Sequence, residues 1–194
     1  MVAETQKSGL KSLFNGQVME KTRAEFGLKN PHQVPRLTKV VVNCGVGRFL
    51  ENQKLKPEVR DTVFGTLTTI TGQRPILIKA KRSVSNFKVR EGAPSAMMVT
   101  LRRDHMWHFL DRLLNLAIPR IKDFRGLKDA SFDHGGSYSM GLTEQAVWPE
   151  INMANVSFTH GMHINIVLTD STPEMSRFML RELGMPFVRA EEQN

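Results

Sequence analysis

The order of the expected helices and strands constrains the fold of this chain more than any other feature. Two short strands, expected around Glu144–Trp148 and Met162–Thr169, follow one another with no helical pattern between them. Parallel neighbours need a long crossover, usually a helix, so this order favours antiparallel pairing over a doubly wound parallel sheet. A chain of 194 residues is long enough to bury one core. We therefore predict a single α+β domain over residues 1–194, with a mainly antiparallel sheet and helices packed against it.

Hydrophobic spacing predicts the other elements. Apolar residues at helical spacing indicate helices at residues 10–27, 55–72, 104–118 and 172–184. β-branched and apolar runs indicate strands at residues 39–43, 75–79 and 96–102. The last helix has the clearest start, because Thr172 can cap it and Pro173 fits its first position.

Polar segments fill the remaining chain. Residues 80–95 contain turn residues between two predicted strands, so we expect a long basic extension there. Residues 124–141 are rich in Gly, Ser and Asp and are expected to form an irregular loop. The ends, residues 1–11 and 189–194, are expected to be flexible extensions of the single domain.

The excess positive charge is concentrated in one segment. The chain has 27 Lys and Arg against 19 Asp and Glu, a formal net charge of +8. Residues 74–103 contain eight basic side chains and one acidic side chain, Glu91, whereas residues 104–194 contain eight basic and 12 acidic ones. A solvated surface usually mixes both signs, because interspersed acids relieve the repulsion between cations. The uncompensated segment therefore favours a polyanionic partner, and counterion release from nucleic-acid phosphates would drive binding.

The sequence also disfavours several classes of protein. A single cysteine, Cys44, excludes an internal disulfide framework and fits a reducing compartment. The longest stretch without a formal charge, residues 151–169, contains amides, hydroxyls and imidazoles, so no membrane span is predicted. No apolar core follows the early charges and no arginine precedes Arg23, which disfavours a secretory signal and a transit peptide. We expect a soluble, cytoplasmic protein.

Candidate catalytic and metal-binding residues have little support. Gly45 and Gly47 follow a predicted strand, but a dinucleotide-binding turn needs a third glycine where Leu50 stands and a helix immediately after. A nucleotide-using enzyme built on residues 45–47 is therefore the disfavoured alternative function. Cys44 has no base near it in sequence and is expected to be a buried thiol. No cofactor and no metal are expected, because the histidine pairs at 105 and 108 and at 160 and 163 lack a metal-site spacing.

The basic extension combines the side chains that RNA recognition uses. Basic, hydroxyl and amide side chains are interleaved in it: Lys81, Arg82, Ser83, Ser85, Asn86, Lys88 and Arg90. Cations bind phosphates, and hydroxyls and amides reach sugars and base edges. Phe87 offers a ring on which a base can stack, and packing beneath the loop is the equally weighted alternative.

Several segments resemble one family of ribosomal proteins. They are VVVNCGVG at 40–47, ITGQRPILIKAKRSVSNFKVREGAP at 70–94, VTLRR at 99–103, IPRIKDFRGL at 118–127, SFDHGGSYSMGLTEQAVWPEI at 131–151 and LGMPF at 183–187. In this order and spacing, over residues 12–188, they resemble the bacterial-type family of large-subunit ribosomal protein number five. The resemblance implies an α+β fold and a non-enzymatic, structural role in the ribosome.

The same resemblance implies partners and site residues. The partners are 5S rRNA, attached by the protein to the central protuberance, large-subunit rRNA and neighbouring ribosomal proteins, P-site tRNA, and a small-subunit protein across an intersubunit bridge. By resemblance, the residues that bind 5S rRNA are Asn43, Gly45, Gln73, Lys79, Thr100 and Arg102. The loop that contacts tRNA is marked by Ser83, Phe87, Lys88 and Arg90. The loop at 124–141 corresponds to part of the bridge surface.

The sequence departs from the family pattern at a few positions. Asn86 stands where the family usually has Gly, Ser95 and Ala96 where it commonly has Ile-Gly, and Met98 where it has Lys. Asn tolerates a positive φ better than most residues, so the turn at Asn86 is expected to survive. The missing lysine weakens the case for a phosphate contact at position 98.

A free regulator that binds its own messenger RNA is a further alternative function, because the same basic surface would bind that RNA.

Overall fold

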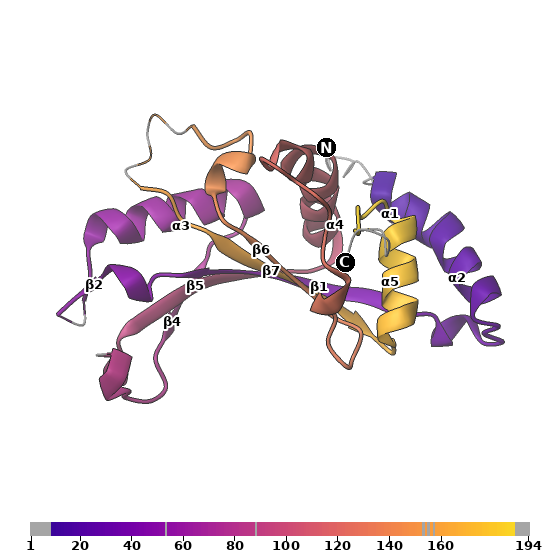
Figure 1. The fold of residues 1–194 in the computed structure, drawn as a ribbon, viewed down its shortest axis with the longest axis horizontal. Coiled ribbons are helices and arrows are strands. Elements are labelled where there is room, and N and C mark those ends of the chain that lie inside the picture. Colours follow the sequence, from indigo (N-terminus) through magenta and orange to yellow (C-terminus); the bar gives the residue numbers. More distant parts are fainter. Residues whose placement is uncertain are drawn as a thin grey trace, which may run out of the picture. The chain divides into compact units, whose positions relative to one another are not determined.

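Figure 1 shows the fold in a computed structural model, which describes residues 9–52, 54–87, 89–152, 154, 156 and 158–188. These residues form two compact units, and the chain passes between the units four times. Unit 1 contains residues up to 40, residues 102–140 and residues from 165 onward, and unit 2 contains residues 41–101 and 141–164. A single domain over residues 1–194 stays a prediction. Of the expected flexible ends, residues 1–8 and 189–194 lie outside the described residues, and residues 9–11 are helical.

Five strands form a sheet in the order β4-β5-β1-β7-β6. The strands are β1 (Arg36–Gly45), β4 (Ile76–Lys79), β5 (Pro94–Leu101), β6 (Tyr138–Leu142) and β7 (Met162–Thr169). β4 and β5 pair antiparallel, with Ile76 opposite Met98. β1 and β7 also run in opposite directions, since the Cys44 thiol near the end of β1 donates to the Gly161 carbonyl just before β7, at 3.3 Å. The predicted α+β class with a mainly antiparallel sheet is confirmed.

The predicted helices are present, and two of them contain π-helical turns. Unit 1 contains α1 (Gly9–Leu13), the π turn η1 (Phe14–Val18), α2 (Met19–Glu25), α4 (Arg103–Arg112), the π turn η5 (Leu113–Ala117) and α5 (Pro173–Glu182), and unit 2 contains α3 (Pro57–Thr71). Thr172 caps α5 as expected, because its hydroxyl accepts a hydrogen bond from the Met175 amide at 3.4 Å. In η5, Leu113 and Ala117 are buried and Leu114 is half-buried. None of the helices in the described residues is long and apolar enough to cross a membrane.

Short elements complete the fold. A two-stranded sheet is formed by β2 (Leu50–Glu51) and β3 (Lys54–Leu55). Single 3₁₀ turns are η2 (Pro31–Gln33), η3 (Gly47–Phe49), η4 (Ser85–Phe87), η6 (Ile118–Arg120), η7 (Asp129–Ser131) and η8 (Gln145–Val147).

The strand predicted around Glu144–Trp148 is wrong, because that segment contains η8. The Gln145 side chain is buried there, donating to the Phe158 carbonyl at 2.9 Å and accepting from the His160 amide at 2.7 Å. The strand is β6 instead, and it covers the last residues of the segment predicted as an irregular loop, residues 124–141, and Leu142. Its alternate residues Tyr138, Met140 and Leu142 are buried, a period-two pattern that the intervening Ser and Gly obscure.

The core of unit 2 lies between α3 and one face of the sheet. Val63, Leu67 and Ile70 of α3 are fully buried, as are Val42 and Cys44 of β1. On β5 the buried residues are Met97, Val99 and Leu101. Figure 1 shows α3 along this side of the strands. Among the described residues, no helix of unit 2 covers the opposite face of β4, β5 and the second half of β1.

Candidate nucleic-acid interface

The uncovered side of the sheet in unit 2, here called the open face, is defined by strand alternation. Residues next to the buried ones point the other way: Asn43 and Gly45 on β1, Ala96, Met98 and Thr100 on β5, and Ile76 and Ile78 on β4, which pair with Met98 and Ala96. Asn43 and Thr100 are half-buried, and Gly45 is exposed. Ile76 is 56% exposed, which is unusual for a large apolar side chain on a sheet. The open face therefore combines apolar side chains with hydrogen-bonding groups.

The other residues expected to bind 5S rRNA stand at the ends of β4 and β5 along the chain. Lys79 follows a bulge at the end of β4, pairs with Pro94 and is exposed. Gln73 is exposed in the turn between α3 and β4, where its backbone amide donates to the Thr71 hydroxyl at 3.3 Å. Arg102 follows β5 directly as the residue before α4 and belongs to unit 1. Unit 2 thus brings five of the six predicted residues to one sheet face and its ends.

The long basic extension is a hydrogen-bonded hairpin rather than an irregular connection; we call residues 80–93 the 80–93 hairpin. Its base is closed by the Ala80 amide donating to Ala93 and the Gly92 amide donating to Ala80, at 2.8 and 2.9 Å. Val84 and Val89 exchange two backbone hydrogen bonds of 2.9 and 3.2 Å. Backbone pairing of this kind holds the segment without a hydrophobic core beneath it.

The tip of the 80–93 hairpin presents its side chains to solvent. Phe87 is 79% exposed, so the alternative that it packs beneath the loop is wrong. Ser83 and Arg90 are also exposed, and the Ser83 hydroxyl accepts from the Glu91 amide at 2.9 Å. Lys88, the fourth residue expected to contact tRNA, lies outside the described residues. The turn holding Asn86 does not use a positive φ at that position, so it needs no glycine there.

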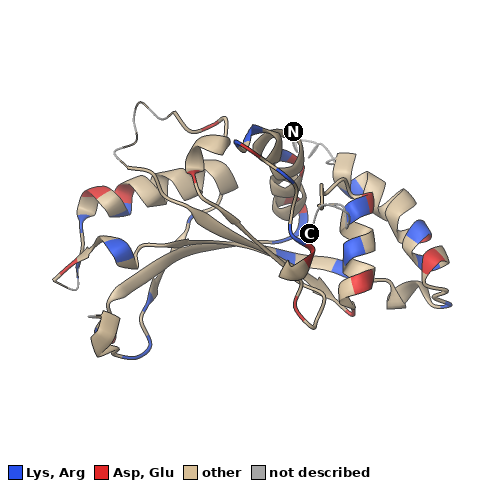
Figure 2. Ribbon diagram, in the orientation of Figure 1, with Lys and Arg blue, Asp and Glu red and all other residues tan. Residues whose placement is uncertain are grey.

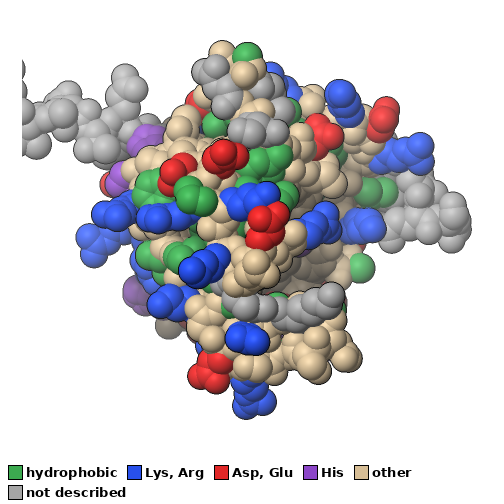
Figure 3. Space-filling view, turned by 90° about the vertical axis from the view of Figure 1, so that its left-hand side faces the viewer, with side chains coloured by type: hydrophobic (Ala, Val, Ile, Leu, Met, Phe, Trp, Pro, Cys, Tyr) green, Lys and Arg blue, Asp and Glu red, His purple; other side chains and the backbone are tan. Residues whose placement is uncertain are grey.

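Most of the cations in residues 74–103 form no ion pair with a carboxylate among the described residues. These six cations are Arg74, Lys79, Lys81, Arg82, Arg102 and Arg103. Figure 2 shows basic positions along the 80–93 hairpin, at the lower left. Figure 3 views the molecule from the side of β2 and this hairpin, and basic side chains are more widespread there than acidic ones. Their charge is available to an external anion.

The glycine turn and the cysteine do not assemble a catalytic site. Gly45 ends β1, and η3 and β2 follow before α3 begins at Pro57, so no α-helix of the described residues starts directly after this turn. Cys44 is fully buried, and burial raises the pKa of its thiol to about 11. The thiol therefore stays protonated near neutral pH and cannot act as a nucleophile.

His160 and His163, one of the two histidine pairs in the sequence, differ in burial. His160 is buried against the ring of Phe158, with 5.6 Å between ring centroids, and burial lowers its pKa. His163, on β7, is exposed on the opposite side from the buried Met162 and Ile164. Among the described residues, no group of three or more potential metal ligands lies together. Sequence reasoning missed His163 as an exposed sheet residue of unit 2, although the period-two pattern at 162–169 contained that signal.

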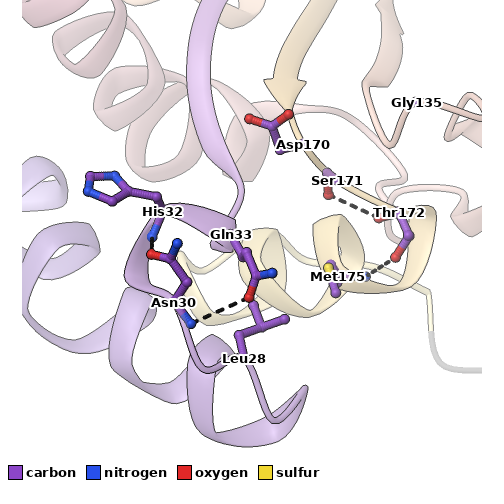
Figure 4. Close-up of a pocket in the computed structure, with 9 residues that line it drawn as sticks. All are labelled: Leu28, Asn30, His32, Gln33, Gly135, Asp170, Ser171, Thr172 and Met175. Carbon is purple, nitrogen blue, oxygen red and sulfur yellow. Dashed lines mark hydrogen bonds between the residues drawn. The ribbon is translucent and has the colours of Figure 1, made fainter.

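A polar pocket of about 750 Å³ in unit 1 has a structural explanation (Figure 4). Asn30 caps η2 by accepting from the His32 amide at 2.9 Å, and Gln33 accepts from the Asn30 amide at 3.4 Å. On the other wall, Ser171 and Thr172 bond to the backbone at the start of α5. These polar groups are used in capping. Among the described residues, no hydrogen bond joins His32, Asp170 and Ser171 of the lining to one another.

Two family models together match most of the chain. Residues 94–187 match the C-terminus of the ribosomal L5 family, and residues 30–90 match Ribosomal protein L5. A Synechocystis relative named Large ribosomal subunit protein uL5 is 46% identical over 178 residues, covering 92% of this chain and 97% of the relative. The chain belongs to the ribosomal protein L5 family. Relatives with the same name from Leifsonia xyli and Geobacter sulfurreducens are 46% and 43% identical. These alignments cover 94% and 92% of this chain and 91% and 97% of the relatives.

Membership in this family confirms the resemblance seen in the sequence and makes the chain a ribosomal protein that binds rRNA and serves translation. The open face of unit 2 and the 80–93 hairpin are, among the described residues, the surfaces whose geometry and charge best suit RNA.

Proposed function

We propose that the chain is a structural constituent of the large ribosomal subunit that binds 5S rRNA through the open face of unit 2. In this role it attaches 5S rRNA to the central protuberance and works in the cytoplasm as part of the ribosome. The observation that carries the proposal is the uncovered sheet face of unit 2, together with four cations of the same unit that form no ion pair within the described residues: Arg74, Lys79, Lys81 and Arg82. The names of the relatives, all large-subunit proteins, support it.

The chemistry of the open face fits folded RNA. Asn43 and Thr100 supply an amide and a hydroxyl for sugar 2′-hydroxyls and base edges, and Gly45 leaves room for a close backbone approach. Lys79 and Arg102 are the proposed phosphate contacts, and the exposed Gln73 is a further polar contact. Helical RNA hides its base edges in a deep groove, so specificity on this face would come from RNA shape.

The 80–93 hairpin is the proposed contact with P-site tRNA. Its exposed Phe87 offers a stacking surface, while Ser83 and Arg90, and Lys88 from outside the described residues, would bind the backbone. A surface around residues 124–141 is the proposed contact with a small-subunit protein across an intersubunit bridge. Since β6 occupies residues 138–142, the loop part of that surface precedes Tyr138, and Ser139 and Gly141 are the exposed residues of the strand.

A filter-binding titration with isolated 5S RNA tests the main proposal. The logarithm of the binding constant should fall linearly with the logarithm of the salt concentration, because each neutralised phosphate releases condensed counterions. The double variant Asn43→Ala with Thr100→Ala should weaken binding by about 1 kcal/mol per lost hydrogen bond. Thr69→Ala, an exposed threonine on α3, is the matched control and should leave affinity unchanged. A slope near zero, or equal affinities for the double variant and the control, would refute 5S binding at the open face.

A sedimentation experiment separates this role from that of a free regulator. The protein should travel with large subunits in a sucrose gradient. Recovery only in the ribosome-free fractions would instead favour binding to its own messenger RNA.

A further inference from the structure

A second pocket in unit 2 lies between α3 and the base of the 80–93 hairpin. Its volume is about 490 Å³, within the range of about 300–1,000 Å³ typical of small-molecule sites. Phe64 of α3, Leu77 of β4 and Met97 of β5 form an apolar lining. Leu77 and Met97 stand opposite each other and point away from the open face. The pocket and the open face are therefore on different sides of the sheet.

All charged side chains that line this pocket are basic. Lys54, Arg60 and Arg74 line it, and no acidic side chain of the described residues does. All three are exposed, and none forms an ion pair within the described residues. Three cations around one concave site attract a ligand with negative charge.

The Phe64 ring and the Arg74 guanidinium of the lining suit a ligand that also has a flat, unsaturated part. Phe64 is half-buried, and the Arg74 guanidinium carbon lies 5.8 Å from the centre of its ring. Aromatic rings and guanidinium planes are the two protein surfaces on which nucleobases stack. Leu77 is 42% exposed although it is apolar, so this lining is open to a ligand.

We infer that this pocket binds one unpaired RNA nucleotide, with its base against Phe64 and Arg74 and its phosphate between Lys54 and Arg60. The inference rests on the proposed function in RNA binding and adds a second contact on the opposite side of the sheet. An unpaired nucleotide fits better than a duplex, because paired bases are stacked on each other and cannot enter a pocket. An acidic peptide would match the rim charge, but it offers no flat ring system for the Phe64 and Arg74 surfaces.

Photocrosslinking of the full chain to a ten-nucleotide oligouridine containing 5-bromouridine tests the inference. The crosslink should map to the peptides that contain Phe64 or Arg74, and a duplex of the same length should not compete for it. Phe64→Leu keeps an apolar side chain but removes the ring, and it should weaken oligouridine binding about tenfold. Lys54→Gln with Arg60→Gln should weaken it further at low salt. Arg120→Gln with Lys122→Gln, exposed in unit 1, is the control that removes the same charge.

The outcomes separate this inference from the proposed function. Crosslinks from 5-bromouridine placed in 5S RNA, or in tRNA bound to the ribosome, would identify the RNA that supplies the nucleotide. If 5S RNA binds normally while crosslinks map only to the open face or the 80–93 hairpin, the pocket assignment is wrong and the proposed function stands. Equal affinities for oligouridine in the variant Lys54→Gln with Arg60→Gln and in its control Arg120→Gln with Lys122→Gln would also overturn the pocket assignment. Competition for the crosslink by polyglutamate but not by unlabelled oligouridine would overturn it too. Loss of binding to every RNA by the unaltered chain would contradict the proposed function itself.

Discussion

Replacing Gly161 by alanine should destabilise unit 2 through a clash that no side-chain movement can relieve. Gly161 precedes β7, and a Cβ atom there would lie 2.6 Å from the Leu142 carbonyl oxygen and 3.2 Å from that of Thr143. Both neighbours are backbone atoms, so β6 or the start of β7 must shift to accept the methyl group. The same shift would disturb the bond from the Cys44 thiol to the Gly161 carbonyl.

The expected cost follows from that geometry. Overpacking in a well-packed region costs about 1–3 kcal/mol, and a rigid backbone clash places this variant toward the upper end. For a domain of this size each kcal/mol lowers the melting temperature by about 2–4 °C, so a fall of about 4–12 °C is expected. Gly141→Ala is the matched control, because its Cβ would meet only the His163 ring at 3.6 Å, an ordinary contact.

Urea unfolding followed by circular dichroism measures the difference. Gly161→Ala should lower the midpoint with little change in the slope m, since the surface exposed on unfolding stays the same. Gly141→Ala should have a midpoint close to that of the unaltered chain. If both variants unfold at the same urea concentration, the close approach between Gly161 and the end of β6 does not limit stability, and the reasoning fails.

Three further predictions concern single surfaces or groups. Phe87→Ala should change the unfolding free energy by less than about 0.5 kcal/mol, because the ring is exposed, yet weaken protection of ribosome-bound tRNA in footprinting; a clear loss of stability would contradict this. Burial lowers the pKa of the His160 imidazole in the folded chain below its ordinary 6.5. As the pH falls below about 6.5, the unfolded chain binds a proton at this histidine before the folded chain does, so the free energy of unfolding should decrease. Urea titrations at pH 7.5 and 5.5 should show a smaller fall for His160→Leu, and an equal fall would exclude this group. Lys79→Gln with Arg102→Gln should reduce the salt slope of 5S binding by about 0.7–0.9 per lost phosphate contact, and an unchanged slope would show that neither residue touches a phosphate.

Elements with a strong local signal could be predicted from the sequence. Helix α5 begins at the expected cap because the Thr172 hydroxyl satisfies a free backbone amide whatever the tertiary surroundings. α3 ends at Gly72, which takes a φ of 67° that other residues rarely adopt. The alternation in β5 places Thr100 on the open face, as the pattern at 96–102 indicates.

Features that depend on distant contacts could not be predicted in this way. The sequence does not predict β6, because Ser139 and Gly141 are residue types typical of loops. Only Tyr138, Met140 and Leu142 of this strand are buried, and their burial depends on tertiary packing. The segment at 144–148 was predicted as a strand, since nothing local shows that Gln145 bonds to residues more than ten positions away. The basic rim of the pocket beside α3 joins Lys54, Arg60 and Arg74, and only the fold brings them together.

The paired valines of the 80–93 hairpin divide it into a stem and a tip. Val84 and Val89 bond through backbone atoms, so replacing side chains at residues 85–87 leaves the stem intact. The two ends of the tip are tied together by these bonds, so part of its conformational entropy is lost on folding rather than on binding. The tip can therefore be substituted by a reporter group or by a different recognition sequence, and β4 and β5 should keep their structure.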